Sequence, residues 1–193
     1  MNVLEHLEPK SVFRFFEEMC AIPHGSRNTK AVSDWCADFA RARGLEYHQD
    51  GDNNIIIIKE AAPGYEAAPP VILQGHLDMV CEQTADCQKD MSREGLDLAV
   101  DGDFVYAKGT TLGGDDGIAV AMALALLDAE GLPHPRLEAV FTVDEEIGLL
   151  GAASIDVTPL KGRQMLNLDS EAEGIFTVSC AGGNTSACLL PLT

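Results

Sequence analysis

The most informative stretch of this sequence is Val71-Ile72-Leu73-Gln74-Gly75-His76-Leu77-Asp78-Met79-Val80. It begins with apolar residues that do not alternate with polar ones, which is typical of a strand buried on both faces of a sheet. Because side chains alternate along a strand, we expect His76 and Asp78 to project to the same side. Imidazole is the commonest metal ligand among side chains, and a neighbouring carboxylate can accept its second N–H. The alternative is a strand-end histidine bonded to an aspartate with no metal.

Four further carboxylates lie just after an apolar strand or at a glycine-rich helix entry, namely Asp115, Glu145, Glu146 and Asp169. Free backbone N–H groups at a helix start favour an anion, which suits Asp115. In open α/β sheets, ligands bind outside the carboxyl ends of the strands. We therefore expect these carboxylates to gather with His76 and to form a site for divalent metal.

Each of these acidic groups also has a purely structural interpretation. The segment Gly113-Gly114-Asp115-Asp116-Gly117 is compatible with a plain turn and helix cap. The pair Glu145-Glu146 is compatible with a solvated helix start, and Asp169 with a simple cap. The combination favours metal, because like charges that converge at strand ends are costly unless cations neutralise them.

Hydrophobic periodicity predicts helices that alternate with apolar strands. The predicted helices span residues 9–22, 29–43 and 118–128. Besides the stretch above, the predicted strands span 45–49, 54–59, 136–143 and 165–168, with a hairpin at 96–106. This alternation indicates an α/β sheet covered by helices on both faces.

Composition limits the classes of partner. The chain has 193 residues, which fits one domain or one large domain with the start of another. Its net charge of −18 argues against nucleic acid and anionic membranes as partners. The same charge is compatible with a solvated acidic surface and with carboxylates gathered around cations.

The cysteines and the first residues bear on the compartment. Six cysteines without CxxC spacing suggest reduced thiols used as small core residues. No basic segment followed by an apolar one opens the chain, and no stretch approaches the roughly 20 apolar residues of a membrane span. We therefore expect a cytoplasmic protein.

Four motifs in order resemble the dinuclear zinc exopeptidases, the family of carboxypeptidase G and peptidase T. They are Gly75–Val80, Gly109–Gly117, Asp144–Gly148 and Asn167–Glu171. Ile22-Pro23-His24-Gly25-Ser26 and Cys180-Ala181-Gly182-Gly183 are similar to the aminoacyl-histidine (Xaa-His) dipeptidase branch. The resemblance implies an α/β fold with a mixed central sheet and helices on both faces, as the N-terminal portion of a zinc-exopeptidase-like catalytic domain.

The resemblance also implies a role for each candidate residue and a cofactor of two Zn²⁺ ions, with Co²⁺ or Mn²⁺ as substitutes. His76 and Asp169 would bind the first metal, Glu146 would bind the second, and Asp115 would bridge both. Asp78 would orient His76, and Glu145 would be the general base that takes a proton from a metal-bridging water. Two cations lower the pKa of bound water and stabilise the oxyanion, which suits amide hydrolysis.

One part of the family pattern has no counterpart here. Family members take a further ligand of the second metal from a histidine beyond an inserted lid and dimerisation domain. Residues 1–180 are therefore expected to be the N-terminal part of a catalytic domain, and residues 181–193 the start of the lid. By this reasoning the 193 residues alone hydrolyse dipeptides weakly or not at all, and the longer form is a homodimer through its lid.

Three functions are compatible with these residues. The first is hydrolysis of small peptide substrates, specifically Xaa-His dipeptides, and the second is hydrolysis of an N-acyl amino acid on the same scaffold. The third is a non-catalytic domain that binds metal. Glu145 beside Glu146 argues against the third, since a binding site does not need a base next to a ligand.

Overall fold

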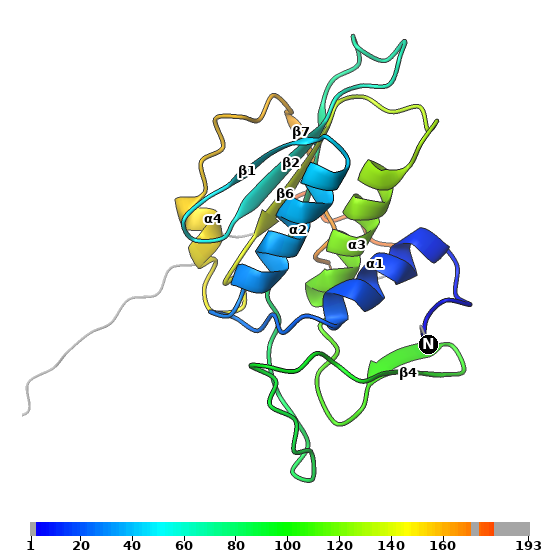
Figure 1. Cartoon of the computed structure of the whole chain (residues 1–193). Coiled ribbons are helices and arrows are strands. Elements are labelled where there is room, and N and C mark those ends of the chain that lie inside the picture. Colours follow the sequence, from blue (N-terminus) through cyan, green and yellow to red (C-terminus); the bar gives the residue numbers. More distant parts are fainter. Residues whose placement is uncertain (1–2, 171–173, 180–193) are drawn as a thin grey trace, which may run out of the picture.

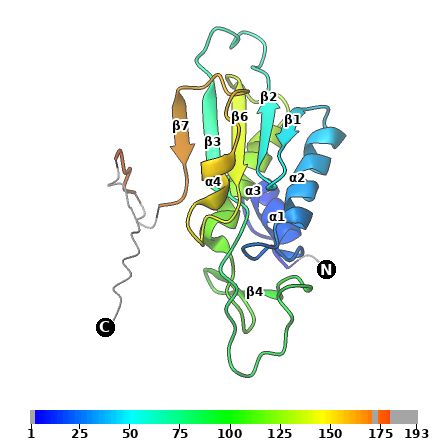
Figure 2. The same cartoon turned by 90° about the vertical axis from the view of Figure 1, so that its left-hand side faces the viewer.

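The central sheet is built around β6 (Leu137–Thr142), whose residues are all buried. The computed structural model describes residues 3–170 and 174–179, and within them five strands pair in the order β1, β2, β6, β3 and β7 (Figure 2). The remaining bounds are β1 Glu46–Gln49, β2 Ile55–Lys59, β3 Val71–His76 and β7 Gln164–Asn167. β2 pairs antiparallel with β1 and β6, whereas β3 pairs parallel with β6 and β7. The sheet is therefore mixed, as expected.

Helices cover both faces of this sheet (Figures 1 and 2). One face carries α1 (Lys10–Cys20), α2 (Lys30–Ala42) and α3 (Gly114–Asp128), and the other carries the short α4 (Leu150–Ser154). A separate hairpin of β4 (Leu98–Asp101) and β5 (Phe104–Ala107) lies below the sheet in Figure 2. None of the described helices is long and apolar enough to cross a membrane.

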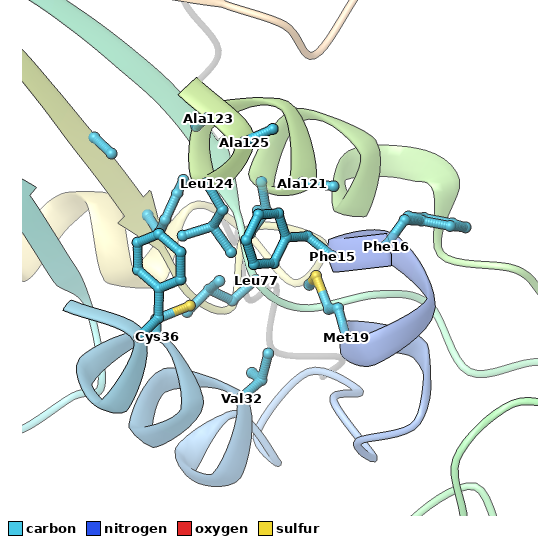
Figure 3. Close-up of a cluster of buried hydrophobic side chains, with 14 of the residues drawn as sticks. Phe15, Phe16, Met19, Val32, Cys36, Leu77, Ala121, Ala123, Leu124 and Ala125 are labelled. Atoms are coloured by element: carbon cyan, nitrogen blue, oxygen red, sulfur yellow. The ribbon is translucent and has the colours of Figure 1, made fainter. Parts of the chain in front are cut away.

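The main core lies between the three larger helices and the sheet (Figure 3). Phe15 of α1 packs edge-on against Phe39 of α2, with ring centroids 5.4 Å apart. Leu124 of α3 and Leu77, just after β3, are fully buried in the same cluster. A smaller cluster on the opposite face contains Ile56, Ile58 and Val140. The isoleucine run of β2 is thus buried on both faces, which explains why it contains no polar residue.

The predicted elements are confirmed with small shifts in their ends. α3 spans Gly114–Asp128, but Asp115 and Asp116 have non-helical backbone angles and form a kink, so the regular helix begins close to the predicted start at residue 118. β3 ends at His76, so the alternation argument does not extend to Asp78, which lies in the following loop. The sequence patterns did not predict α4. The expected start of a lid at residues 181–193 lies outside the described residues.

The cysteines agree in part with the expectation of core thiols. Cys20 and Cys36 are buried and free. Burial raises the pKa of the Cys20 thiol to about 12, which keeps it protonated and unreactive. Cys81 is exposed and so differs from the expectation, while Cys180 and Cys188 lie outside the described residues.

A buried ion pair fixes the segment that enters β7. The Glu138 side chain is fully buried in β6 and accepts a 2.7 Å hydrogen bond from Arg136 Nε. Its two oxygens also accept the backbone N–H groups of Lys161 and Gly162. Burial alone would raise the pKa of Glu138, but these donors outweigh it and lower that pKa. The carboxylate therefore stays ionised and holds the chain just before β7.

We expect Glu138→Gln to destabilise the fold by about 1.5–3 kcal/mol, because it removes the buried charge that pairs with Arg136 Nε and leaves Arg136 with the mostly exposed Glu60 carboxylate. Urea unfolding measures this change. The matched control is Glu60→Gln, since Glu60 also pairs with Arg136 but its side chain is 71% exposed. The control should change the free energy of unfolding by about 1 kcal/mol or less. Equal losses in the two variants would contradict the role given to Glu138.

Candidate metal centre

Parallel pairing of β3 with β6 brings the candidate residues to one edge of the sheet. His76, the last residue of β3, lies opposite Thr142, the last residue of β6. Glu145 and Glu146 follow β6 by three and four residues, and Asp115 lies in the first turn of α3. The carboxyl ends of parallel strands meet at the same edge, so the predicted gathering of these side chains is observed.

Three of the candidate ligands lie close together. One ligand atom from each of His76, Asp115 and Glu146 lies within 4.8 Å of the other two. His76 Nε2 is 3.0 Å from Asp115 Oδ1 and 4.0 Å from Glu145 Oε2. The imidazole is buried, whereas the Asp115 side chain is 68% exposed. The cluster is therefore anchored in the core on one side and open to solvent on the other.

The hydrogen bonds of His76 determine which nitrogen faces the cluster. Nδ1 is 2.8 Å from the backbone carbonyl of Asp78 and 3.5 Å from Oδ1 of the same residue. A carbonyl oxygen only accepts, so Nδ1 carries the proton in the neutral ring and Nε2 presents its lone pair to Asp115. The principal orienting acceptor is thus the Asp78 carbonyl, and the carboxylate that the sequence suggested is farther away.

The Asp78 carboxylate instead holds the backbone of the two glutamates. Its Oδ1 accepts the N–H of Glu145 at 3.0 Å, and its Oδ2 accepts the N–H of Glu146 at 3.4 Å. Ser26 Oγ donates to Oδ2 at 2.7 Å. Burial alone would raise the pKa of Asp78, but hydrogen bonds from His76, Ser26 and Glu145 lower it. Asp78 is therefore a buried anion that connects β3, the Glu145–Glu146 segment and the loop containing Ser26.

Asp116 is a site residue to which the sequence reasoning gave no role. Its side chain is buried, and Oδ2 accepts the backbone N–H of His76 at 3.2 Å. The bond ties the start of α3 to the end of β3. A Cβ on Gly75 would lie 2.6 Å from this oxygen, so glycine is required for the approach. The sequence signal that could have revealed this role is the pair Asp115-Asp116. Asp115 faces the cluster, whereas Asp116 faces the core.

Asp169 lies at the same edge but outside the group of three. It lines a pocket of about 190 Å³ together with Asp115 and Asp116. Its negative charge contributes to raising the pKa values of Asp116 and Glu145, which places it within electrostatic range of both. The structure therefore brings Asp169 to the site without placing it among the closest ligand atoms.

The charges at this edge need a counterion. Burial raises the pKa values of Glu145 and Glu146, and neighbouring carboxylates raise them further. The same two causes raise the pKa of Asp116 to about 7. Burial lowers the pKa of His76, but Asp78, Asp116 and Asp115 outweigh it and raise that pKa to about 10. A negative field of this kind stabilises a cation, whether a proton or a metal ion.

The donor set fits a divalent metal such as zinc. His76 Nε2 and Asp115 Oδ1 are both acceptors in their ordinary states, yet they face each other at 3.0 Å. A proton or a cation between them satisfies both atoms. Imidazole nitrogen and carboxylate oxygen are both ligand types that Zn²⁺ takes in proteins.

Comparison with known proteins places these residues in a family. The model of Peptidase family M20/M25/M40 matches residues 72–183. The cytosol non-specific dipeptidase of Escherichia coli (strain K12) is 38% identical over 183 residues, covering 95% of this chain and 38% of that protein. The crystal structure of aminoacylhistidine dipeptidase from Vibrio alginolyticus is 38% identical with a TM-score of 0.86, over 89% of this chain and 35% of that one.

A more distant relative shares the fold alone. A tripeptidase from Staphylococcus aureus superposes with a TM-score of 0.69 at 22% identity, over 84% of this chain and 44% of that one. The chain thus spans 38% of the length of the Escherichia coli relative and 35% of that of the Vibrio alginolyticus one. The described sheet and helices have the fold of the corresponding part of these peptidases.

We expect Gly75→Ala to destabilise the fold by about 1–3 kcal/mol, the usual range for overpacking a filled site. The added methyl group would lie 2.6 Å from Asp116 Oδ2 and 3.2 Å from Ala119 Cβ. Thermal or urea unfolding measures the loss. Gly51→Ala is the control, because no atom lies within 4 Å of its ideal Cβ. A Gly75→Ala variant as stable as this control would contradict the close approach described here.

Proposed function

Because the chain belongs to peptidase family M20/M25/M40, we propose that the whole protein is a metal-dependent dipeptidase. The observation that carries the proposal is the convergence of His76, Asp115 and Glu146, with Glu145 4.0 Å from the same imidazole nitrogen. A base beside a ligand cluster is what hydrolysis requires and what metal storage does not.

We propose that His76, Asp115, Glu146 and Asp169 hold two Zn²⁺ ions, for which Co²⁺ or Mn²⁺ can substitute. In this assignment His76 and Asp169 serve one ion, Glu146 serves the other, and Asp115 serves both. When bound, the ions polarise the scissile carbonyl and lower the pKa of water. The exposed side of Asp115 leaves the cluster open to a substrate from solvent.

The side chains around the cluster supply the general base and position the ligands. Glu145 accepts a proton from the attacking water and delivers it to the leaving amine. Its half-buried position and raised pKa suit this exchange, because a carboxylate with a higher pKa is a stronger base. The Asp78 carbonyl fixes the ring of His76, and the Asp78 carboxylate fixes the backbone of Glu145 and Glu146.

For the substrate we propose dipeptides of the Xaa-His type. The 38% identity to the Vibrio alginolyticus aminoacylhistidine dipeptidase supports this choice, while the equally similar Escherichia coli relative is named as non-specific. Hydrolysis of N-acyl amino acids on the same scaffold is the second candidate. A panel of Xaa-His, other dipeptides and N-acyl amino acids, assayed with the whole protein, separates them.

We also propose a cellular location, a class of partner and an oligomeric state for the whole protein. A cytoplasmic location is supported by the name of the Escherichia coli relative and by the free, buried Cys20 and Cys36. The net charge of −18 favours small peptides over nucleic acid or anionic membranes as partners. We further propose that the whole protein is a homodimer.

We expect Glu145→Gln in the whole protein to lower dipeptide turnover by about 10²–10⁴-fold, the usual contribution of a general acid–base group. Metal content should stay close to that of the parent, because Glu145 is not assigned as a ligand. Kinetics and metal analysis on the same preparation measure both effects. Glu18→Gln, an exposed change on α1, is the control. Turnover within a few-fold of the parent would refute the assignment of Glu145 as base.

We expect Asp115→Ala to lose more metal than His76→Ala, because Asp115 serves two ions in this assignment and His76 serves one. Metal analysis after dialysis of both variants measures the difference. His48→Ala, on the exposed part of β1, controls for the loss of a histidine elsewhere. The same metal content in the Asp115 and His76 variants would contradict a shared ligand.

A further inference from the structure

The loop between α1 and α2 runs alongside the segment that follows β3. Gly25 forms a parallel bridge with Met79, in which His24 O accepts the Met79 N–H at 3.2 Å and Met79 O accepts the Ser26 N–H at 3.3 Å. An ideal Cβ on Gly25 would lie 2.5 Å from Cys81 Sγ and 3.8 Å from Met79 O, so the two segments run close together here. This loop is therefore fixed in register beside Asp78, although 52 residues separate Ser26 from Asp78.

The loop contacts the segment of the two glutamates in two ways. Ser26 Oγ donates to Asp78 Oδ2 at 2.7 Å, and the two oxygens of Asp78 accept the N–H groups of Glu145 and Glu146. Independently, the backbone N–H of Arg27 donates to Asp144 Oδ1 at 2.6 Å.

We propose that Ser26 is a positioning residue, which acts through the Asp78 carboxylate to hold Glu145 and Glu146 in place for metal binding and base catalysis. This inference rests on the proposed function. It gives a role to the Ile22–Ser26 motif, which contains none of the proposed metal ligands and not the proposed base.

The physical basis is that a buried carboxylate such as Asp78 is stable only when hydrogen-bond donors surround it. The Asp78 side chain is fully buried, so solvent cannot replace a lost hydrogen bond. Without the Ser26 hydroxyl, Oδ2 keeps the long 3.4 Å contact from the Glu146 N–H while Oδ1 stays bonded to the Glu145 N–H, so the carboxylate is drawn to reorient around Oδ1 toward another donor. Because Glu145 and Glu146 are held by the same two oxygens, their backbone would move with it. Loss of an outer partner of a metal ligand typically costs about 10–100-fold in affinity.

The experiment is a titration of the purified 193-residue chain with Co²⁺, which reports both affinity and coordination through its visible absorption. We compare the parent with Ser26→Ala, which removes the hydroxyl, and Ser26→Thr, which keeps it. Ser92→Ala is the matched control, because Ser92 Oγ also donates to a carboxylate, Asp90 Oδ1 at 2.6 Å, in an exposed loop. Thermal unfolding of the metal-free proteins checks that all four fold alike.

We expect Ser26→Ala to weaken Co²⁺ binding by about tenfold and to change the absorption band, at the lower end of the range for outer partners. Ser26→Thr and Ser92→Ala should match the parent in both. Parent-like binding by Ser26→Ala would overturn the positioning role while leaving the proposed function intact. An equal loss in Ser26→Thr, or a loss matched by a lower melting temperature of the metal-free Ser26→Ala protein, would also overturn it. Absence of Co²⁺ binding by the parent would overturn the positioning role in this chain, and the dipeptide assay on the whole protein would then decide the proposed function separately.

Discussion

The parallel register between β3 and β6 is the constraint on which the site depends. With His76 opposite Thr142, both strands end level, and the chain leaving each strand has to turn at the same edge. The ladder continues one step farther, since Leu77 N–H donates to Thr142 O. A shift of β3 by one residue would turn His76 toward the opposite face of the sheet and remove it from Asp115. The register is itself secured by burial, because every residue of β6 is inside the protein.

The gathering of acidic groups at this edge works against folding, and the structure offsets it locally. Asp78 and Asp116 are buried carboxylates, and each is used to hold backbone. Asp116 accepts the N–H of His76, while Asp78 accepts those of Glu145 and Glu146. Asp115 and the glutamate side chains remain at least partly in contact with solvent. The acidic residues of the site thus fall into two groups. Asp78 and Asp116 are buried and fix the backbone, whereas Asp115, Glu145 and Glu146 are accessible to ions and solvent.

Much of this arrangement could be predicted from the sequence, for identifiable reasons. His76, Asp115 and Glu146 were found because each follows an apolar strand or begins a helix, and strand ends at one sheet edge must converge. Asp78 was predicted to orient His76 through its carboxylate, whereas its carbonyl is the nearer acceptor, because β3 ends at His76, two residues before Asp78. The bond from Ser26 to Asp78 and the role of Asp116 join residues far apart in sequence, so no local pattern reveals them. Local periodicity also could not predict the strand order, in which β6 lies between β2 and β3. Nor could it predict α4, which has only five residues.

β7 is attached to the sheet less firmly than β3 and β6, so the two sides of the candidate metal centre differ in local stability. Among the described strands β7 pairs with β3 alone, through four exposed residues, and the Glu138 carboxylate fixes only the segment before it. β6, by contrast, is paired on both sides and fully buried. Local opening free energies follow burial and pairing, so β7 belongs to a less stable unit than β3 and β6. The segment that carries Asp169 therefore follows the strand with the lower opening free energy, whereas His76 lies on the strand that pairs directly with the buried β6.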